Sequence, residues 1–344
     1  MLPTVSVFAL TTHGLETVGA HEMGALPGVT VTQIAYRRIS ATCSAPLALL
    51  LGLRTVDDVF LDLATWTGLG RTRAALARLH AYGLHLDLSQ ALVAYARVRP
   101  LGVPPTFSVS ASFVGRRNYS IPELKSTLAT GIVRAYGWVH NNNDAAADLG
   151  IRLFIEHETA YVGVQLGKLP LHERSYRLAH RPGALKPSVA AALVAVAGIR
   201  AGMRVLDPCC GTGTIVIEAA HQGAVALGGD IDPEGIAAAR MNAAHAGVNV
   251  TLRAMDARHL PLAAGAVDRA VSNLPWGRQV QVDATLATFY RQSLAELARV
   301  LTPDGTITVL TSAPDLVSLA DWRCLERIDI SLFGQRPTIL VCAP

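Results

Sequence analysis

From Lys186 onward the chain alternates between short apolar runs and longer amphipathic stretches. The apolar runs that predict strands are R-V-L-D, A-V-A-L-G-G-D, V-T-L-R-A-M-D, D-R-A-V-S-N and T-I-T-V-L-T, with helical patterns between most of them. Near-continuous apolar strands that alternate with helices are typical of a parallel, doubly wound sheet. The tail from Leu325 to Cys342 predicts two strands joined by G-Q-R-P, an edge hairpin. We therefore predict an α/β, Rossmann-like domain over residues 186–344.

The pattern before residue 186 predicts two smaller α/β domains and a connection. In residues 1–66 the order is strand, helix, strand, strand, helix, strand, which is the ferredoxin-like order. Residues 67–168 predict two helices, a strand at 107–113, a helix from Ile121 to Tyr136 and two closing strands. Residues 169–185 contain proline and arginine without a clear period, so they are interpreted as a linker.

Composition narrows the class of protein. With 344 residues, 51% of them hydrophobic, the chain can bury several cores, yet no run reaches the roughly 18–20 apolar residues of a membrane span. The N-terminus reads as a first strand and lacks the basic start and cleavage site of a signal peptide. The five cysteines form no CxxC pair, which favours a reduced cytoplasm, and the histidines show no metal-ligand spacing. We expect no membrane partner and no metal.

Charge is unevenly distributed along the chain. Residues 1–185 carry a net charge of +5 and residues 186–344 a net charge of −1, which together give the overall +4. A basic front half fits a polyanion partner such as nucleic acid, although compositional drift would give the same excess.

A glycine-rich loop, D-P-C-C-G-T-G-T at 207–214, follows a predicted strand and opens a predicted helix. Gly211 and Gly213 allow a sharp turn and close approach of a ligand. A nucleoside triphosphate loop would require a Gly-Lys-Ser/Thr ending, and a dinucleotide loop would require a third glycine where Val216 stands. The remaining candidate is a ligand that presses on the loop without placing a phosphate on the helix.

Carboxylates follow three successive strands of the predicted sheet, at Asp207, Asp230 and Asp256. Asp230 can accept from ribose hydroxyls, Asp256 from an exocyclic amine, and Asp207 can brace the loop or meet an ammonium group. An aspartate in such a position often only caps the next helix, but three of them beside the glycines favour a ligand that combines a nucleoside with an amino acid, S-adenosylmethionine. The predicted cofactor residues are Asp207, Cys210, Gly211, Thr212, Gly213, Thr214, Asp230, Ile231, Asp256, Ala257 and Asn273.

Three motifs resemble those of a known family. L-H-E-R-S-Y-R at 171–177, D-P-C-C-G-T-G-T at 207–214 and N-L-P-W-G at 273–277 are similar to motifs of the class I S-adenosylmethionine-dependent methyltransferases that carry a THUMP domain and modify N2 of guanosine 6 in tRNA. The resemblance implies a THUMP RNA-binding domain at 67–168 that grips tRNA. We expect the protein to be a monomer. The resemblance leaves guanosine 10 of tRNA or a 23S rRNA guanine as alternative targets, and a catalytically silent RNA-binding protein as the alternative of a different class. The RNA-binding candidates are Arg116, Arg117, Lys125 and Arg134.

The S-N-L-P-W-G stretch at 272–277 is the predicted catalytic loop. The Asn273 side-chain oxygen and a backbone carbonyl, with Leu274 favoured, would accept hydrogen bonds from an exocyclic amine and turn it toward the methyl donor. Pro275 would fix the loop, and Trp276 would stack on a flipped base, a contact worth about 1–3 kcal/mol. The alternatives are a plain turn with a core tryptophan, and a cysteine nucleophile. The second is disfavoured because Cys209 and Cys210 lie in the glycine loop, where we interpret them as packing residues.

Overall fold

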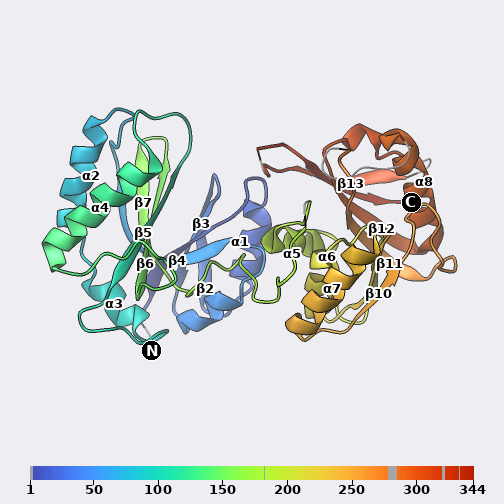
Figure 1. Cartoon of the computed structure of the whole chain (residues 1–344), viewed down its shortest axis with the longest axis horizontal. Helices are drawn as coiled ribbons and strands as arrows, with labels where there is room; N and C mark the ends of the chain where they lie inside the picture. The colour runs from blue at the N-terminus through green and yellow to red at the C-terminus, as the bar shows by residue number, and fades with distance from the viewer. Residues whose placement is uncertain (1–2, 182, 278–284, 320–321, 333) are drawn as a thin grey trace. The chain divides into compact units, whose positions relative to one another are not determined.

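The structure, a computed structural model, divides the chain into two compact units (Figure 1). The N-terminal unit consists of residues 1–10, 20–53 and 57–171, and the C-terminal unit of residues 11–19, 54–56 and 172–344. The residues that the structure describes are 3–181, 183–277, 285–319, 322–332 and 334–344.

The N-terminal unit contains one seven-stranded sheet of order β2-β3-β1-β4-β7-β6-β5. Its strands are β1 (Val5–Leu10), β2 (Val29–Ala35), β3 (Arg38–Cys43), β4 (Asp58–Trp66), β5 (Phe107–Phe113), β6 (Leu149–Glu156) and β7 (Thr159–Gln165). The strand order predicted for residues 1–66 is present, with a short 3-10 helix, η1 (Leu47–Gly52), in place of the second helix. Because β4 pairs with β7, the sheet runs on across the domain boundary predicted at residue 66.

Helices α2 (Ala74–Leu84) and α4 (Ile121–Tyr136) pack together in this unit, and α3 (Ser89–Tyr95) follows α2 along the chain. The bounds of α4 agree with the sequence prediction because its ends carry clear signals. Ser120 and Glu123 form a reciprocal capping box, and Gly137 ends the helix in the left-handed region. The fold of the helix pair therefore follows from local sequence at its ends and from apolar spacing between them.

The C-terminal unit has the doubly wound sheet that the sequence predicts, in the order β10-β9-β8-β11-β12-β14-β13. Strands β8 to β12 run parallel, and the tail forms the predicted antiparallel hairpin. The strands are β8 (Arg204–Asp207), β9 (Val225–Asp230), β10 (Val250–Ala254), β11 (Val267–Asn273), β12 (Leu301–Thr311), β13 (Arg323–Asp329) and β14 (Thr338–Ala343). The helices are α1 (Glu16–Gly24), whose first residues belong to this unit, α5 (Pro187–Val196), α6 (Thr214–His221), α7 (Pro233–Ala246), α8 (Leu286–Val300) and the 3-10 helix η2 (Pro314–Leu316).

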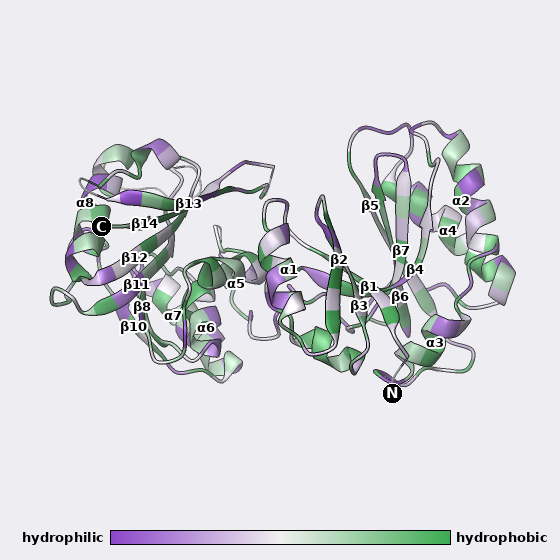
Figure 2. Ribbon diagram, turned by 180° about the vertical axis from the view of Figure 1, so that it is seen from behind, coloured by the Kyte–Doolittle hydropathy of each residue, from purple (hydrophilic) through white to green (hydrophobic). Residues whose placement is uncertain are grey.

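Helix α5 is the most deeply buried helix of this unit. Each residue from 187 to 194 is buried, and Figure 2 shows the helix as a largely hydrophobic segment. A helix that is apolar on all sides needs protein on all sides. None of the described helices combines the length and the apolar character that crossing a membrane requires.

Residues 11–19 contribute to the core of the C-terminal unit. Leu15 is fully buried in the same cluster as Ile330, and the His13 carbonyl accepts a hydrogen bond from the Ser331 N–H. The glycine at 14 lies so close to the chain at Asp329 that an added Cβ would be 2.3 Å from its carbonyl oxygen. The compact unit that contains the predicted methyltransferase domain therefore also includes residues far upstream of 186.

The segment interpreted as a linker is anchored to the C-terminal unit at two places. The Tyr176 hydroxyl lies 2.8 Å from a carboxylate oxygen of Glu218 on α6. The Asn242 side chain of α7 accepts from the backbone N–H groups of Leu178 and Ala179, and its amide donates to the carbonyl of Thr212 in the glycine loop. Residues 176–179 are thus tied to the helices that flank the loop.

Candidate active site

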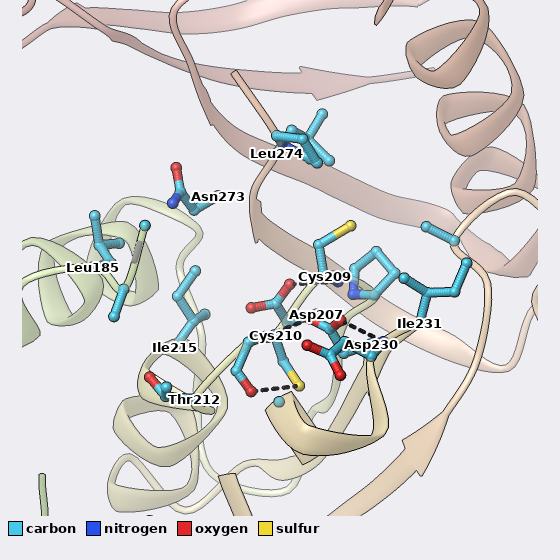
Figure 3. Close-up of a pocket in the computed structure, with 18 of the residues that line it drawn as sticks. Leu185, Asp207, Cys209, Cys210, Thr212, Ile215, Asp230, Ile231, Asn273 and Leu274 are labelled. Atoms are coloured by element: carbon cyan, nitrogen blue, oxygen red, sulfur yellow. Dashed lines mark hydrogen bonds between the residues drawn. The ribbon is translucent and has the colours of Figure 1, made fainter. Parts of the chain in front are cut away.

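A cavity of about 470 Å³ opens at the carboxyl ends of β8, β9 and β11 in the C-terminal unit (Figure 3). This volume lies within the range of small-molecule and cofactor sites. The cavity is lined by Arg181, Gly183, Ala184, Leu185, Asp207, Pro208, Cys209, Cys210, Gly211, Thr212, Thr214, Ile215, Asp230, Ile231, Asp232, Gly235, Asp256, Ala257, Arg258, Asn273, Leu274, Pro275, Trp276, Phe289, Leu332 and Gln335. Every predicted cofactor residue except Gly213 is among them.

Both glycines of the loop have a backbone conformation that other residues rarely adopt. Gly211 and Gly213 have φ angles of 50° and 81°, in the left-handed region that favours glycine. Gly213 lies behind the loop as the N-cap of α6, where an added Cβ would come within 3.0 Å of the Ala239 Cβ on α7. It shapes the loop without lining the cavity.

Asp207, at the end of β8, braces the loop from beneath. Its side chain is almost fully buried and accepts from the Ser272 hydroxyl at 2.7 Å and from the Cys209 N–H at 3.1 Å. Burial raises the pKa of this carboxyl to about 7, while the hydrogen bonds from Ser272 and Cys209 act in the opposite direction. Of the two roles that the sequence left open, these contacts supply bracing.

Asp230 fixes the glycine loop from the neighbouring strand. One carboxylate oxygen accepts from the Gly211 N–H at 2.8 Å and the other from the Asp232 N–H at 3.0 Å. Since an ionised carboxylate can accept about four hydrogen bonds, capacity remains for ligand hydroxyls. Ile231, directly after it, is 62% exposed and supplies an apolar wall.

Asp256 lies two residues beyond the end of β10 and is held by Arg258. The Arg258 guanidinium donates to both carboxylate oxygens at 2.7–3.0 Å, and its backbone N–H donates to one of them. These hydrogen bonds lower the pKa of the Asp256 carboxyl. The sequence did not reveal this pairing, although D-A-R places the two side chains two residues apart. A ligand amine has to share Asp256 with Arg258 or displace it.

Arg181 reaches the cavity from the segment interpreted as a linker. It forms ion pairs with Asp232 and, at 3.1 Å, with Glu234, both at the start of α7. This residue was not predictable from the sequence, because R-P-G alone carries no binding signal. Pro182, in the same segment, lies outside the described residues.

The N-L-P-W-G loop begins where the sequence places it, with Asn273 as the last residue of β11. The Asn273 side-chain oxygen is buried and accepts no hydrogen bond within the described chain, and the Trp276 indole N–H is likewise buried without an acceptor there. The Leu274 N–H donates to the Leu310 carbonyl at 3.2 Å. Trp276 is half-buried and packs against the core cluster that contains Leu332. Figure 3 shows Asn273 and Leu274 apart from the group formed by the acidic residues of β8 and β9.

Comparison with known proteins shows the family to which the chain belongs. Residues 174–331 match the UPF0020 model, described as an RMKL-like methyltransferase domain. The chain is 32% identical over 255 residues to a Thermus thermophilus tRNA (guanine(6)-N2)-methyltransferase, a match that covers 69% of this chain and 75% of the relative. The chain belongs to this family of S-adenosylmethionine-dependent RNA methyltransferases.

Further similarity extends over the whole fold. The crystal structure of TrmN from Thermus thermophilus aligns with a TM-score of 0.80 at 28% identity and covers 99% of both chains. A U6 snRNA (guanine-N(2))-methyltransferase of Mus musculus, THUMPD2, is 30% identical over 218 residues, which cover 60% of this chain and 39% of that relative. The α/β class and the recognition made from the three motifs are thereby confirmed.

In this chain, the two cysteines of the glycine loop are poor nucleophiles. Burial and the carboxylates of Asp207 and Asp230 raise the pKa of both Cys209 and Cys210. A nucleophilic cysteine requires the opposite shift. In the part of the chain that the structure describes, His, Cys, Asp and Glu form no group of three or more that could hold a metal ion.

The four basic residues predicted to bind RNA differ in their surroundings. Arg116 and Arg134 are exposed and Lys125 is half-buried. Arg117 donates to the backbone carbonyls of Leu69 and His157 and to the Tyr119 hydroxyl, so its guanidinium already has internal partners. Arg116, Lys125 and Arg134 remain the better candidates for phosphate contacts.

Proposed function

We propose that the protein transfers the methyl group of S-adenosylmethionine to the exocyclic N2 of a guanosine in tRNA, with guanosine 6 of the acceptor stem as the target. The observation that carries the proposal is the unpartnered Asn273 side-chain oxygen at the edge of the cavity. A buried acceptor without a donor is costly, and an exocyclic amine is a donor. The tRNA and guanosine 6 assignments rest on the motifs and on the Thermus relative.

The chemistry requires orientation more than a strong base. The lone pair of an exocyclic amine is delocalised into the ring, and hydrogen bonds to the Asn273 oxygen and the Leu274 carbonyl would favour a more tetrahedral nitrogen. The nitrogen attacks the methyl carbon, the carbon–sulfur bond breaks, and S-adenosylhomocysteine leaves with the electron pair. The proton that the nitrogen loses passes to solvent after transfer. We expect the Asn273 side chain to turn toward the base as the flipped base enters.

The cavity residues fit the methyl donor. Asp230 has free acceptor capacity for the ribose hydroxyls, and Ile231 and Ala257 supply apolar contacts for the adenine. Asp256 would accept from the adenine amine, and Asp207 holds the loop on which the donor lies. Trp276 would offer its ring face to the target base.

The N-terminal unit would bind the RNA. Its basic surface residues Arg116, Lys125 and Arg134 would contact phosphates, as the THUMP resemblance implies. We propose that the protein acts as a monomer in the cytoplasm. Guanosine 10 of tRNA and a 23S rRNA guanine remain the alternative targets. An intact N-L-P-W-G and three carboxylates around one cavity disfavour a silent RNA-binding protein.

The test is to incubate the full-length protein with labelled S-adenosylmethionine and an unmodified tRNA transcript, digest the RNA, and map the labelled nucleoside. We expect N2-methylguanosine at position 6. Label at another guanosine would correct the target, label at a ring carbon would overturn the chemistry, and no label in any transcript or rRNA would favour the silent protein.

A further inference from the structure

Tyr290 on α8 lies beside the catalytic loop and is completely buried. Its hydroxyl is 2.6 Å from the Thr311 hydroxyl and 3.1 Å from the Pro275 carbonyl oxygen. The Thr311 hydroxyl also accepts from the Ala313 N–H at 2.9 Å. Neither Tyr290 nor Thr311 belongs to a motif that the sequence predicts to be functional.

The donors and acceptors fix the direction of this chain of hydrogen bonds. A carbonyl can only accept, so the Tyr290 hydroxyl donates its single hydrogen to Pro275. The Thr311 hydroxyl therefore donates to the Tyr290 oxygen and receives from Ala313. Hydrogen bonds that run in one direction polarise and strengthen one another in a dry interior.

The chain of hydrogen bonds ends on the loop that carries the predicted acceptors. Leu274 precedes a proline, which favours the extended region for its backbone. Among the described residues its carbonyl accepts no hydrogen bond, whereas the next carbonyl along the chain, that of Pro275, accepts from Tyr290. The Leu274 N–H is itself held by Leu310, the neighbour of Thr311 on β12.

We propose that Tyr290 is a positioning residue for methyl transfer. By holding the Pro275 carbonyl, it keeps the Leu274 carbonyl and the Asn273 side chain in the arrangement that receives the target amine. Thr311 sets the direction of the Tyr290 hydroxyl. The identity of the amine rests on the proposed function, whereas the bracing of the loop rests on the contacts alone. A displacement of about 1 Å in such a site lowers a rate by about a hundredfold.

The test is Tyr290→Phe, which removes one oxygen and keeps the ring. Single-turnover methyl transfer at saturating S-adenosylmethionine should be about 10- to 100-fold slower. Affinity for S-adenosylhomocysteine, measured by calorimetry, should stay within about twofold, because the tyrosine does not line the cavity. Tyr95→Phe is the matched control. Tyr95 is also buried, and its hydroxyl donates to a backbone carbonyl at 3.1 Å in the N-terminal unit.

Substitutions of Thr311 provide an independent test of the proposal. Thr311→Val should slow transfer as Tyr290→Phe does, Thr311→Ser should restore most of the rate, and the double variant with Tyr290→Phe should be little slower than the worse single one. Transfer by Tyr290→Phe at the wild-type rate would overturn the proposal, as would an equal loss in Tyr95→Phe. If Tyr290→Phe fails to fold, the Val and Ser variants decide. A wild-type product other than N2-methylguanosine would refute the proposed function, and a slow Tyr290→Phe would still support the brace.

Discussion

Arg54 is expected to stabilise the helix that follows the glycine loop, although it lies far from that helix in sequence. Its guanidinium is 2.6 Å from the carboxylate of Glu218 on α6, whose side chain is 1% exposed. Arg174, at 3.5 Å, and the Tyr176 hydroxyl complete the surroundings of this carboxylate. The L-H-E-R-S-Y-R motif therefore supplies two of the three partners of a buried charge.

Arg54→Ala removes the nearest partner. Breaking a buried ion pair costs about 3–5 kcal/mol, but the Arg54 side chain is 24% exposed and Glu218 keeps two partners, so we expect about 2 kcal/mol. Hydrogen exchange of the α6 amides should then be about thirtyfold faster in the variant. Arg73→Ala is the control, because its pair with Glu123 has the same 2.6 Å separation but is solvent-exposed, and it should leave the local amides unchanged. Unchanged exchange in Arg54→Ala would refute the reasoning.

Three further outcomes are expected. The folded-state pKa of Asp207 is about 7, above its ordinary value of about 3.9, so the ligand-free protein should lose stability as pH rises from about 4 to 7. In urea titrations at several pH values, Asp207→Asn should remove this part of the pH dependence of the unfolding free energy. The same pH dependence in the wild type and the variant would contradict the prediction. Asp230→Ala should weaken S-adenosylhomocysteine binding in calorimetry by at least about tenfold, since the loop and the ribose lose one acceptor; wild-type affinity would exclude the assigned role. Asn273→Ala should slow single-turnover transfer by about a hundredfold with little change in ligand affinity, whereas Trp276→Ala should slow transfer and also weaken RNA binding. A wild-type rate for Asn273→Ala would rule out the proposed mechanism.

Local signals in the sequence were sufficient for most elements of the fold. The period of the apolar residues predicts the strands of the C-terminal sheet, and the capping box at Ser120 with Gly137 fixes both ends of α4. The pairing of β4 with β7 was not predictable in this way, because a strand's partner depends on distant residues that local periodicity does not encode. The same holds for Leu15, which looks like any other apolar residue of a helix start.

The residues of the candidate site likewise include some that local sequence predicts and some that it does not. Gly211, Asp230 and Asn273 were predictable because they occur in short motifs at strand ends, where parallel strands bring them together. The partners Ser272, Arg258 and Tyr290 were not, since a side chain's hydrogen-bond partner is set by tertiary packing. The internal acceptors of Arg117 were not predictable either, because a basic residue in a polar stretch gives no sign of which distant backbone carbonyls it contacts.

The place of Leu15 in the C-terminal core has a consequence for how the protein is made. Leu15 leaves the ribosome long before Ile330, which lies in the same cluster. The nascent chain must therefore keep this apolar segment available while the residues between them are synthesised, and the packing of Leu15 with Ile330 closes a very long loop. A gene fragment that begins at residue 186 would encode the glycine loop and N-L-P-W-G yet lack Leu15 and the cavity residues Arg181 and Leu185. It would also lack Arg54, Arg174 and Tyr176, which contact Glu218. The catalytic half is in this sense made from segments that are translated far apart in time.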